Sequence, residues 1–185
     1  MFGAVADFIP VERALYPGSY VDLSASTAFA CVTYVDTDAR AARFFADADL
    51  VAEELAGRCR EGAGREVRFL AADYSQPFEV DDGSQDLVIS LFAGPMWDAV
   101  RRYLRPGGWL LANASHGDAS LAALDPSLEL IAVIASGAHG HELVTEDLGE
   151  YLVPKRADRA REGLIRSSGR GVEYTRPAFA YLFAT

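Results

Sequence analysis

The sequence predicts an α/β protein built on one open sheet with helices on both of its faces. Short apolar, β-rich runs alternate along the chain with segments of helical pattern, as in a mostly parallel sheet. One run, Leu87-Val88-Ile89, is apolar throughout, which is typical of a strand buried on both faces. A length of 185 residues is enough for a substantial core, so we expect a single domain over residues 1–185.

Seven β-rich runs are expected to form the strands of this sheet. They combine β-branched and aromatic residues, and they are bounded by turn signals such as Pro17-Gly18. In chain order the expected strands are 13–18, 31–38, 66–75, 85–94, 109–115, 128–136 and 177–185.

Three helical segments are expected between the strands, over 47–62, 95–108 and 118–125. In the first, Val51 and Leu55 share one face, and in the second Trp97 and Val100 do so. Trp97 and Tyr103 are expected to pack in the core.

Residues 137–177 interrupt the alternation of strands and helices. They are rich in glycine at both ends and charged in the middle, so we expect an insertion that acts as a lid or a substrate-binding segment. Its part 155–166 has Leu164 among the apolar residues of one face and predicts a solvated amphipathic helix. The alternative is that Arg159 or Arg161 binds a carboxylate or phosphate of a substrate.

Composition and charge narrow the class of protein. Half of the residues are hydrophobic and 24% are charged, as in ordinary globular proteins. The net charge of −10 argues against broad binding of nucleic acid, which depends on Lys and Arg contacts to phosphates. No apolar run is long enough to span a membrane, and residues 1–13 do not have the pattern of a secretion signal. Cys31 and Cys59 match no metal spacing. We therefore expect a cytoplasmic protein with no membrane or nucleic-acid partner, and its oligomeric state stays open.

Two stretches, "AADYSQPFEVDDGSQDLVISLFAG" (71–94) and "YLRPGGWLLAN" (103–113), resemble the class I S-adenosylmethionine-dependent methyltransferases. The resemblance extends over nearly the whole chain. It implies a Rossmann-like open seven-stranded sheet, mostly parallel with an antiparallel C-terminal strand, and S-adenosyl-L-methionine as cofactor. The first motif departs from the family pattern, because Gly18 is its only glycine where the family usually carries several. Glycine at such positions removes the Cβ and permits positive φ.

The resemblance also implies where the cofactor binds. An acid at the end of the second strand holds the ribose, for which Asp36 is preferred to Asp38, since Asp38 could instead cap the next helix. Asp73 matches the position that faces the adenine, and Tyr74 could pack on the ring. The full set of expected cofactor-binding residues is Tyr16, Pro17, Gly18, Asp36, Asp38, Asp73, Tyr74, Ser90, Leu91 and Phe92.

His116 is the candidate catalytic residue. Methyl transfer mainly needs alignment, but an oxygen nucleophile also needs a base, and His116 follows the fifth strand at the edge of the expected cleft. The alternative is a loop histidine that is hydrogen-bonded to Asp118 or to solvent. His139 and His141, next to Glu142, lack further ligands nearby and are expected on a surface loop, so no metal site is predicted.

The preferred hypothesis is a methyltransferase that acts on a small-molecule acceptor. The alternative is a methyltransferase-like fold without methyl transfer, which binds a ligand or regulates a partner. Another group transfer on the same scaffold, such as aminopropyl transfer, is a third hypothesis. Signatures of phosphate-binding loops, serine hydrolases and zinc sites are absent from the sequence.

Overall fold

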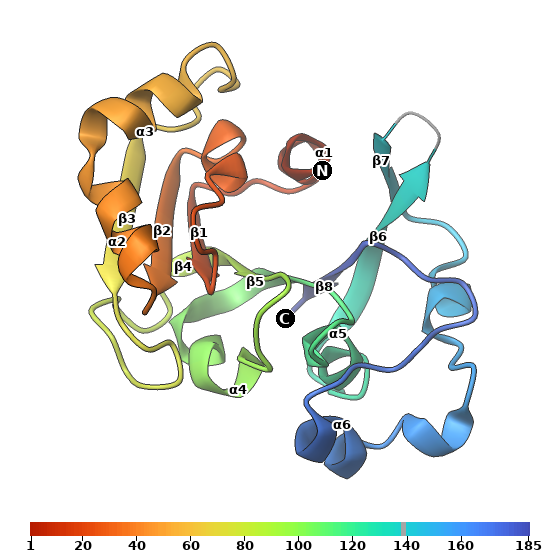
Figure 1. Cartoon of the computed structure of the whole chain (residues 1–185). Helices are drawn as coiled ribbons and strands as arrows, with labels where there is room; N and C mark the ends of the chain where they lie inside the picture. The colour runs from red at the N-terminus through yellow and green to blue at the C-terminus, as the bar shows by residue number, and fades with distance from the viewer. Residues whose placement is uncertain (138–139) are drawn as a thin grey trace.

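The computed structural model describes residues 1–137 and 140–185, and its centre is one mixed sheet (Figure 1). The eight strands of the described residues are β1 (Arg13–Pro17), β2 (Cys31–Asp36), β3 (Glu66–Ala71), β4 (Gln85–Ser90), β5 (Leu104–Ala112), β6 (Glu129–Gly137), β7 (Gly140–Val144) and β8 (Ala180–Ala184). Their order is β3-β2-β1-β4-β5-β8-β6-β7. Strands β1 to β5 pair in parallel, whereas β8 runs antiparallel to both β5 and β6. The predicted open, mostly parallel sheet with an antiparallel last strand is confirmed.

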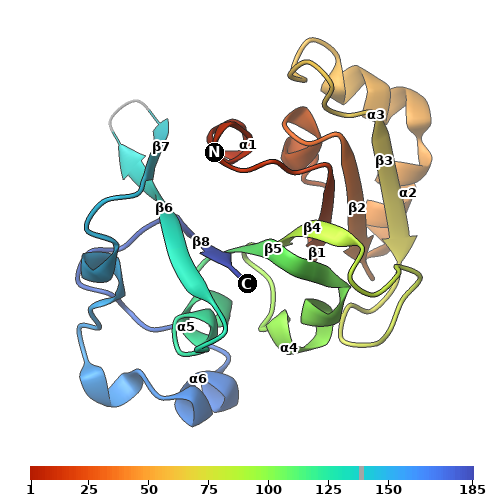
Figure 2. The same cartoon turned by 180° about the vertical axis from the view of Figure 1, so that it is seen from behind.

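Helices cover both faces of this sheet. They are α1 (Phe2–Phe8), η1 (Ser24–Thr27), α2 (Ala39–Ala46), α3 (Ala48–Leu55), α4 (Trp97–Val100), η2 (Arg101–Tyr103), α5 (Asp118–Ala122), η3 (Leu148–Leu152), η4 (Ala157–Arg159) and α6 (Glu162–Ser168). Figure 2 shows α2 and α3 beside β2 and β3, with α4, α5 and α6 along the other side of the molecule. Leu15 and Tyr16 of β1 belong to two different buried clusters, because successive side chains of a strand point to opposite faces. The sheet therefore has one core on each face.

The prediction of seven strands is wrong by one, because β7 forms an additional edge strand. It pairs antiparallel with β6, from Val133 opposite Val144 to Gly137 opposite Gly140. Its sequence, GHELV, contains two exposed polar residues, so it lacks the apolar run from which the other strands were predicted.

The helices are shorter than predicted. The helix predicted over 47–62 ends at Leu55, and a separate helix, α2, precedes it. The segment 95–108 contains only the short α4 and the single turn of η2, since β5 begins at Leu104, before the Pro-Gly-Gly turn. Trp97 and Tyr103 are buried as predicted.

Part of the segment 137–177 is packed onto the sheet rather than lying free. Tyr151, Ile165 and Val172 are buried in the cluster on the face of α4 and α5. The single amphipathic helix expected over 155–166 is wrong: η4 and α6 are separate, and Ile165, 2% exposed, faces the core instead of Leu164, 41% exposed.

None of the helices of the described residues combines the length and the apolar character needed to cross a membrane.

Candidate functional site

The loops after β1 and β4 meet at the carboxyl edge of the sheet, where the strand order reverses. The chain runs outward from β1 through β2 to β3 and then returns to β4 on the other side of β1. In open α/β sheets, ligands bind outside the carboxyl ends of the strands at such a reversal. Of the three non-glycine residues with positive φ in the described chain, two lie in these loops: Tyr20 at 53° and Phe92 at 58°. Since such backbone strain concentrates at functional sites, this edge is the candidate site.

The loop after β1 contains two left-handed residues although it has a single glycine. Gly18 has a φ of 66°, and Tyr20 takes the second left-handed position. The Gly18 N–H donates to the Val35 carbonyl at 2.7 Å, and the Tyr20 N–H donates to Asp36 Oδ2 at 2.9 Å. These bonds fasten the loop to the end of β2. The loop therefore keeps a tight path without the additional glycines.

The two acids at the end of β2 make different contacts. Asp36 is partly buried, and its two oxygens accept from the N–H groups of Tyr20 and of Asp38, the latter at 2.8 Å. Asp38 is the N-cap of α2 and accepts from the Arg40 N–H and guanidinium, both at 2.7 Å. These hydrogen bonds from Arg40 lower the pKa of Asp38 to about 2. The structure thus shows the capping role for Asp38, and Asp36 is the acid directed at the loop.

Arg40 also connects α2 with this loop. Its guanidinium carbon lies 5.1 Å from the centroid of the Tyr20 ring, which is the geometry of a cation–π contact. Tyr20 is 41% exposed, so the pair lies on the rim of the candidate site.

Asp73 lies in a turn after β3. It is exposed and accepts from the Ser75 N–H at 2.8 Å, and hydrogen bonds from Ser75 hold its pKa below the ordinary value. The neighbouring Tyr74 reaches back to the first loop: a Cβ on Gly18 would lie 3.5 Å from Tyr74 Cε1 and only 2.4 Å from Ala93 Cβ. The loop after β4 thus packs directly on Gly18, and this packing itself requires a glycine.

Asp118 holds the loop after β4 in place. This buried carboxylate accepts from Ser90 Oγ at 2.5 Å, from the Met96 N–H at 2.9 Å and from the Trp97 N–H at 3.2 Å. Burial raises the pKa of Asp118, against the effect of these hydrogen bonds. This role of Asp118 was not predicted from the sequence, in which Asp118 stands out only as an alternative partner of His116.

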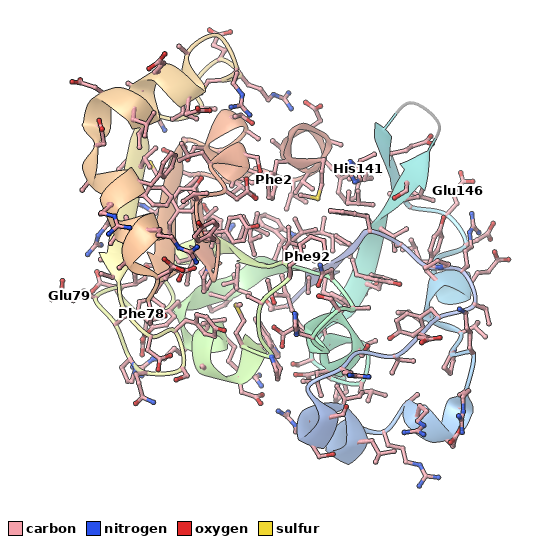
Figure 3. All side chains as sticks on the ribbon, in the orientation of Figure 1. Phe2, Phe78, Glu79, Phe92, His141 and Glu146 are labelled. Atoms are coloured by element: carbon pink, nitrogen blue, oxygen red, sulfur yellow. The ribbon has the colours of Figure 1, made fainter. Side chains whose placement is uncertain are left out.

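A cavity of about 380 Å³ opens at the reversal point. Figure 3 shows Phe2 of α1, His141 of β7 and Phe92 of the loop after β4, which all line it although they lie far apart in the sequence. Its polar wall is formed by Tyr16 and Asp22: the Tyr16 hydroxyl donates to Asp22 Oδ2 at 3.1 Å. Burial, with the Asp22 charge nearby, raises the pKa of Tyr16 far above its ordinary value, so this phenol stays neutral. The cavity is therefore aromatic, with one carboxylate.

Three solved structures resemble this fold at TM-scores of 0.50 or 0.51. The first is the cofactor-bound protein Rv0187 from MTB, with 16% identity over 77% of this chain and 74% of that chain and a TM-score of 0.50. The second is the Methanococcus maripaludis protein mmp1179, assigned as an S-adenosyl-L-methionine-dependent methyltransferase, with 13% identity over 100% of this chain and 84% of that chain and a TM-score of 0.50. The third is the tRNA (m1A58) methyltransferase TrmI from Aquifex aeolicus, with 15% identity over 99% of this chain and 66% of that chain and a TM-score of 0.51. The chain has the fold of S-adenosylmethionine-dependent methyltransferases. The sequence itself matches no family model and no curated protein. It spans about half the length of several other methyltransferase structures that it matches.

In this methyltransferase fold, the residues predicted for the cofactor lie along one edge but have different surroundings. Tyr16, Leu91 and Phe92 line the cavity at the reversal point. Pro17 is buried in register with Val35, inside the sheet. Ser90 is bonded to Asp118 and buried, so its hydroxyl faces the protein.

His116 lines a second cavity on the same edge, of about 570 Å³, beyond the end of β5. Consecutive residues of the segment before β8 line the two cavities, Phe179 the first and Ala178 the second, so the cavities are neighbours along this edge. The carboxylate of Asp118 accepts hydrogen bonds from Ser90, Met96 and Trp97, so the structure does not show the alternative in which Asp118 is the partner of His116.

His141 lies on an exposed edge strand and its ring packs on Phe179, with centroids 4.3 Å apart. His139 lies outside the described residues. Within those residues, no group of three or more His, Cys, Asp or Glu side chains is placed to hold a metal ion.

Proposed function

We propose that the protein is an S-adenosylmethionine-dependent methyltransferase that acts on a small molecule. The observation that carries this proposal is the loop after β1, which contains two left-handed residues and binds Asp36 at the strand-order reversal. The fold supports it, because it resembles a cofactor-bound protein, a tRNA methyltransferase and a protein assigned as an S-adenosylmethionine-dependent methyltransferase.

Asp36 is the residue that we assign to the ribose hydroxyls. A carboxylate has about four acceptor positions, and backbone N–H groups use one on each oxygen of Asp36. The remaining positions fit a pair of hydroxyl donors, and charge-assisted hydrogen bonds of this kind are strong. Asp36 therefore fits the role of the ribose-binding acid.

The methionine end is assigned to the cavity beside Tyr16. Ala93 packs against Gly18, so the space between these two residues is already filled. The Asp22 carboxylate, which lies beside Tyr16 in the polar wall of this cavity, suits an ammonium group. Gly18 contributes by allowing the loop and the residues after β4 to approach each other closely.

The remaining cofactor contacts are assigned from position along the edge. Asp73 and Tyr74 keep the adenine assignment, and Leu91 and Phe92 form the lip of the cavity. Phe92 is 60% exposed and its ring contacts Phe179, so it closes the mouth of the cavity on the side of β8.

Bound S-adenosylmethionine supplies an electrophilic methyl group on a sulfonium. The contribution of the chain is to align an acceptor with it, and to exclude water by the aromatic lining of Phe2, Phe92 and Phe179. His116 is the proposed base for an oxygen acceptor, and its position assigns the acceptor to the second cavity.

Calorimetric titration with S-adenosylmethionine and S-adenosylhomocysteine tests the cofactor assignment. We expect micromolar binding of both, and at least a tenfold loss in Asp36→Asn, because a hydrogen bond to a charged group is worth roughly 1.5–3 kcal/mol and about 1.4 kcal/mol is tenfold. Asp47→Asn is the matched control, since Asp47 caps α3 through the Leu50 N–H away from the site. Equal affinity in the two variants would remove the ribose assignment.

The second candidate function is a methyltransferase-like protein that binds a ligand or a partner without methyl transfer. It is favoured by the contact of Ala93 with Gly18, which fills the space beside the one glycine of the loop. Absence of cofactor binding up to millimolar concentration would select this candidate.

A further inference from the structure

The second cavity of the carboxyl edge adjoins a third, of about 650 Å³, and cationic side chains line both. Lys155 and Arg170 border the two cavities, while Arg156 and Arg159 line the third. One acid, Glu173, lines them as well. This concentration of cations contrasts with the net charge of −10 of the whole chain.

Most of these cations have weak partners. Lys155 lies 3.6 Å from Glu173, and Asp158 serves both Arg156 at 3.1 Å and Arg159 at 3.9 Å. All of these side chains are more than half exposed, and exposed ion pairs contribute little, so an incoming anion can replace their acids. The four cationic side chains that line the cavities and the two carboxylates that pair with them, Glu173 and Asp158, give a local charge of about +2.

Arg170 has no ion pair and no side-chain hydrogen bond to another residue of the described chain. Its loop is nevertheless held firmly. The Val172 N–H donates to the buried Ser120 Oγ at 2.8 Å, and a Cβ on Gly171 would lie 1.7 Å from the Ala114 carbonyl oxygen. The backbone beside Arg170 is therefore fixed, so that binding of an anion has to order only the side chain.

The inner wall of the second cavity is apolar and neutral. It is formed by Tyr174, Tyr181 and Ala178, and both phenols are almost fully buried. Burial raises the pKa of Tyr181 to about 12 and that of Tyr174 in the same direction, so neither carries charge near pH 7. A hydrophobic wall with a cationic rim matches a ligand that has an apolar body and one anionic end.

We propose that these adjoining cavities bind a small organic anion, a carboxylate or phosphate with a hydrophobic body, whose charged end pairs with Arg170 and Lys155. The guanidinium suits both kinds of anion because its planar donors can engage two oxygens at once. The further step that this anion is the methyl acceptor rests on the proposed function, because His116 lines the same cavity.

Calorimetric titration of the full chain with phenyl phosphate and with benzoate tests the site, with benzyl alcohol as the neutral probe. We expect binding of at least one anionic probe, at least tenfold tighter than benzyl alcohol and weakened by salt. Arg170→Gln should weaken it at least tenfold. Arg161→Gln is the matched control, because it removes the same charge from the same segment but lines neither cavity, and it should change the affinity less than twofold.

Three results would overturn the proposal. The first is that neither anionic probe binds at least tenfold more tightly than benzyl alcohol, and the second is that Arg170→Gln and Arg161→Gln weaken binding of the anionic probe equally. The third is that a short oligonucleotide binds more tightly than phenyl phosphate and competes with it. Thermal unfolding of Arg170→Gln shows whether the variant is folded, and a Lys155→Gln variant tests a second cation of the same site.

Titration of Arg170→Gln with S-adenosylmethionine separates the anion site from the proposed function. Retained cofactor binding with loss of the anion supports the anion site, whereas anion binding without any cofactor binding in the unmodified protein contradicts only the proposed function.

Discussion

At the residue scale, the single glycine of the first loop does not prevent a tight turn. Tyr20 adopts the left-handed conformation in place of a second glycine, held by its N–H bond to Asp36. The sequence could show that glycines were absent, but it could not show this conformation, because local propensity disfavours positive φ for tyrosine. Asp36 and Asp38 could be predicted as alternatives, and only the contacts of Arg40 separate their roles.

Gly18→Ala tests how closely the two loops pack. The new Cβ would meet Ala93 Cβ at 2.4 Å at a φ of 66°, so both overpacking and backbone strain should destabilise the protein, by about 2–4 kcal/mol together. Gly57→Ala is the control, since Gly57 has a φ of 70° and open space around it, and should show the strain alone. Denaturant unfolding measures both variants. Equal losses would mean that the loop after β4 yields easily and does not depend on this contact.

At the scale of elements, most strands could be predicted because each combines β-branched, aromatic and other apolar residues in one run that is bounded by turn signals. The edge strand β7 was not predicted, since an edge strand needs no apolar run. Helix α2 was not predicted either: the helix expected over 47–62 begins at Asp47, which is the C-cap of α2 and the N-cap of α3. Asp118 could not be assigned from sequence, as its partners Ser90 and Met96 lie more than twenty positions away.

Asp118→Ala tests the link between β4, α4 and α5. It removes the acceptor of Ser90 and leaves the buried Met96 N–H unsatisfied, so we expect a loss of about 3 kcal/mol at low pH. Because burial raises the pKa of Asp118 above 3.8, its contribution to stability is complete below pH 3.8 and declines as the pH rises through the raised value. The difference in unfolding free energy between wild type and variant should therefore shrink with rising pH. A difference that grows instead would show that the carboxylate is more stable in the folded protein than outside it.

At the scale of the whole molecule, alternation of strand and helix was sufficient to predict the α/β class and the position of the candidate edge. The two cavities could not be predicted, because their walls combine distant segments: Phe2, Phe92 and His141 in one, and His116 and Arg170 in the other. The overall composition did not predict the cationic cavities either, since the net charge of the whole chain is −10 although cationic side chains predominate at these cavities.

Hydrogen exchange tests this picture of the sheet. The central strands β1, β4 and β5 are paired on both sides and buried between two cores, so their amides should exchange slowest, through global unfolding. The amides of the two edge strands, β3 and β7, should exchange fastest among the strands, because each of them pairs with a single neighbour in the described chain. Protection of β7 equal to that of β4 would indicate that the edge strand is covered in solution.

The position of β8 has a consequence for biosynthesis. This strand is made after all the others, yet it lies between β5 and β6 and pairs with both. While the ribosome is still adding residues 138–179, both neighbours carry open backbone donors and acceptors that can recruit another chain. These two edges therefore stay unpaired with β8 until residues 180–184 have been made, and a chain truncated before residue 180 would leave β5 and β6 without the strand that joins them.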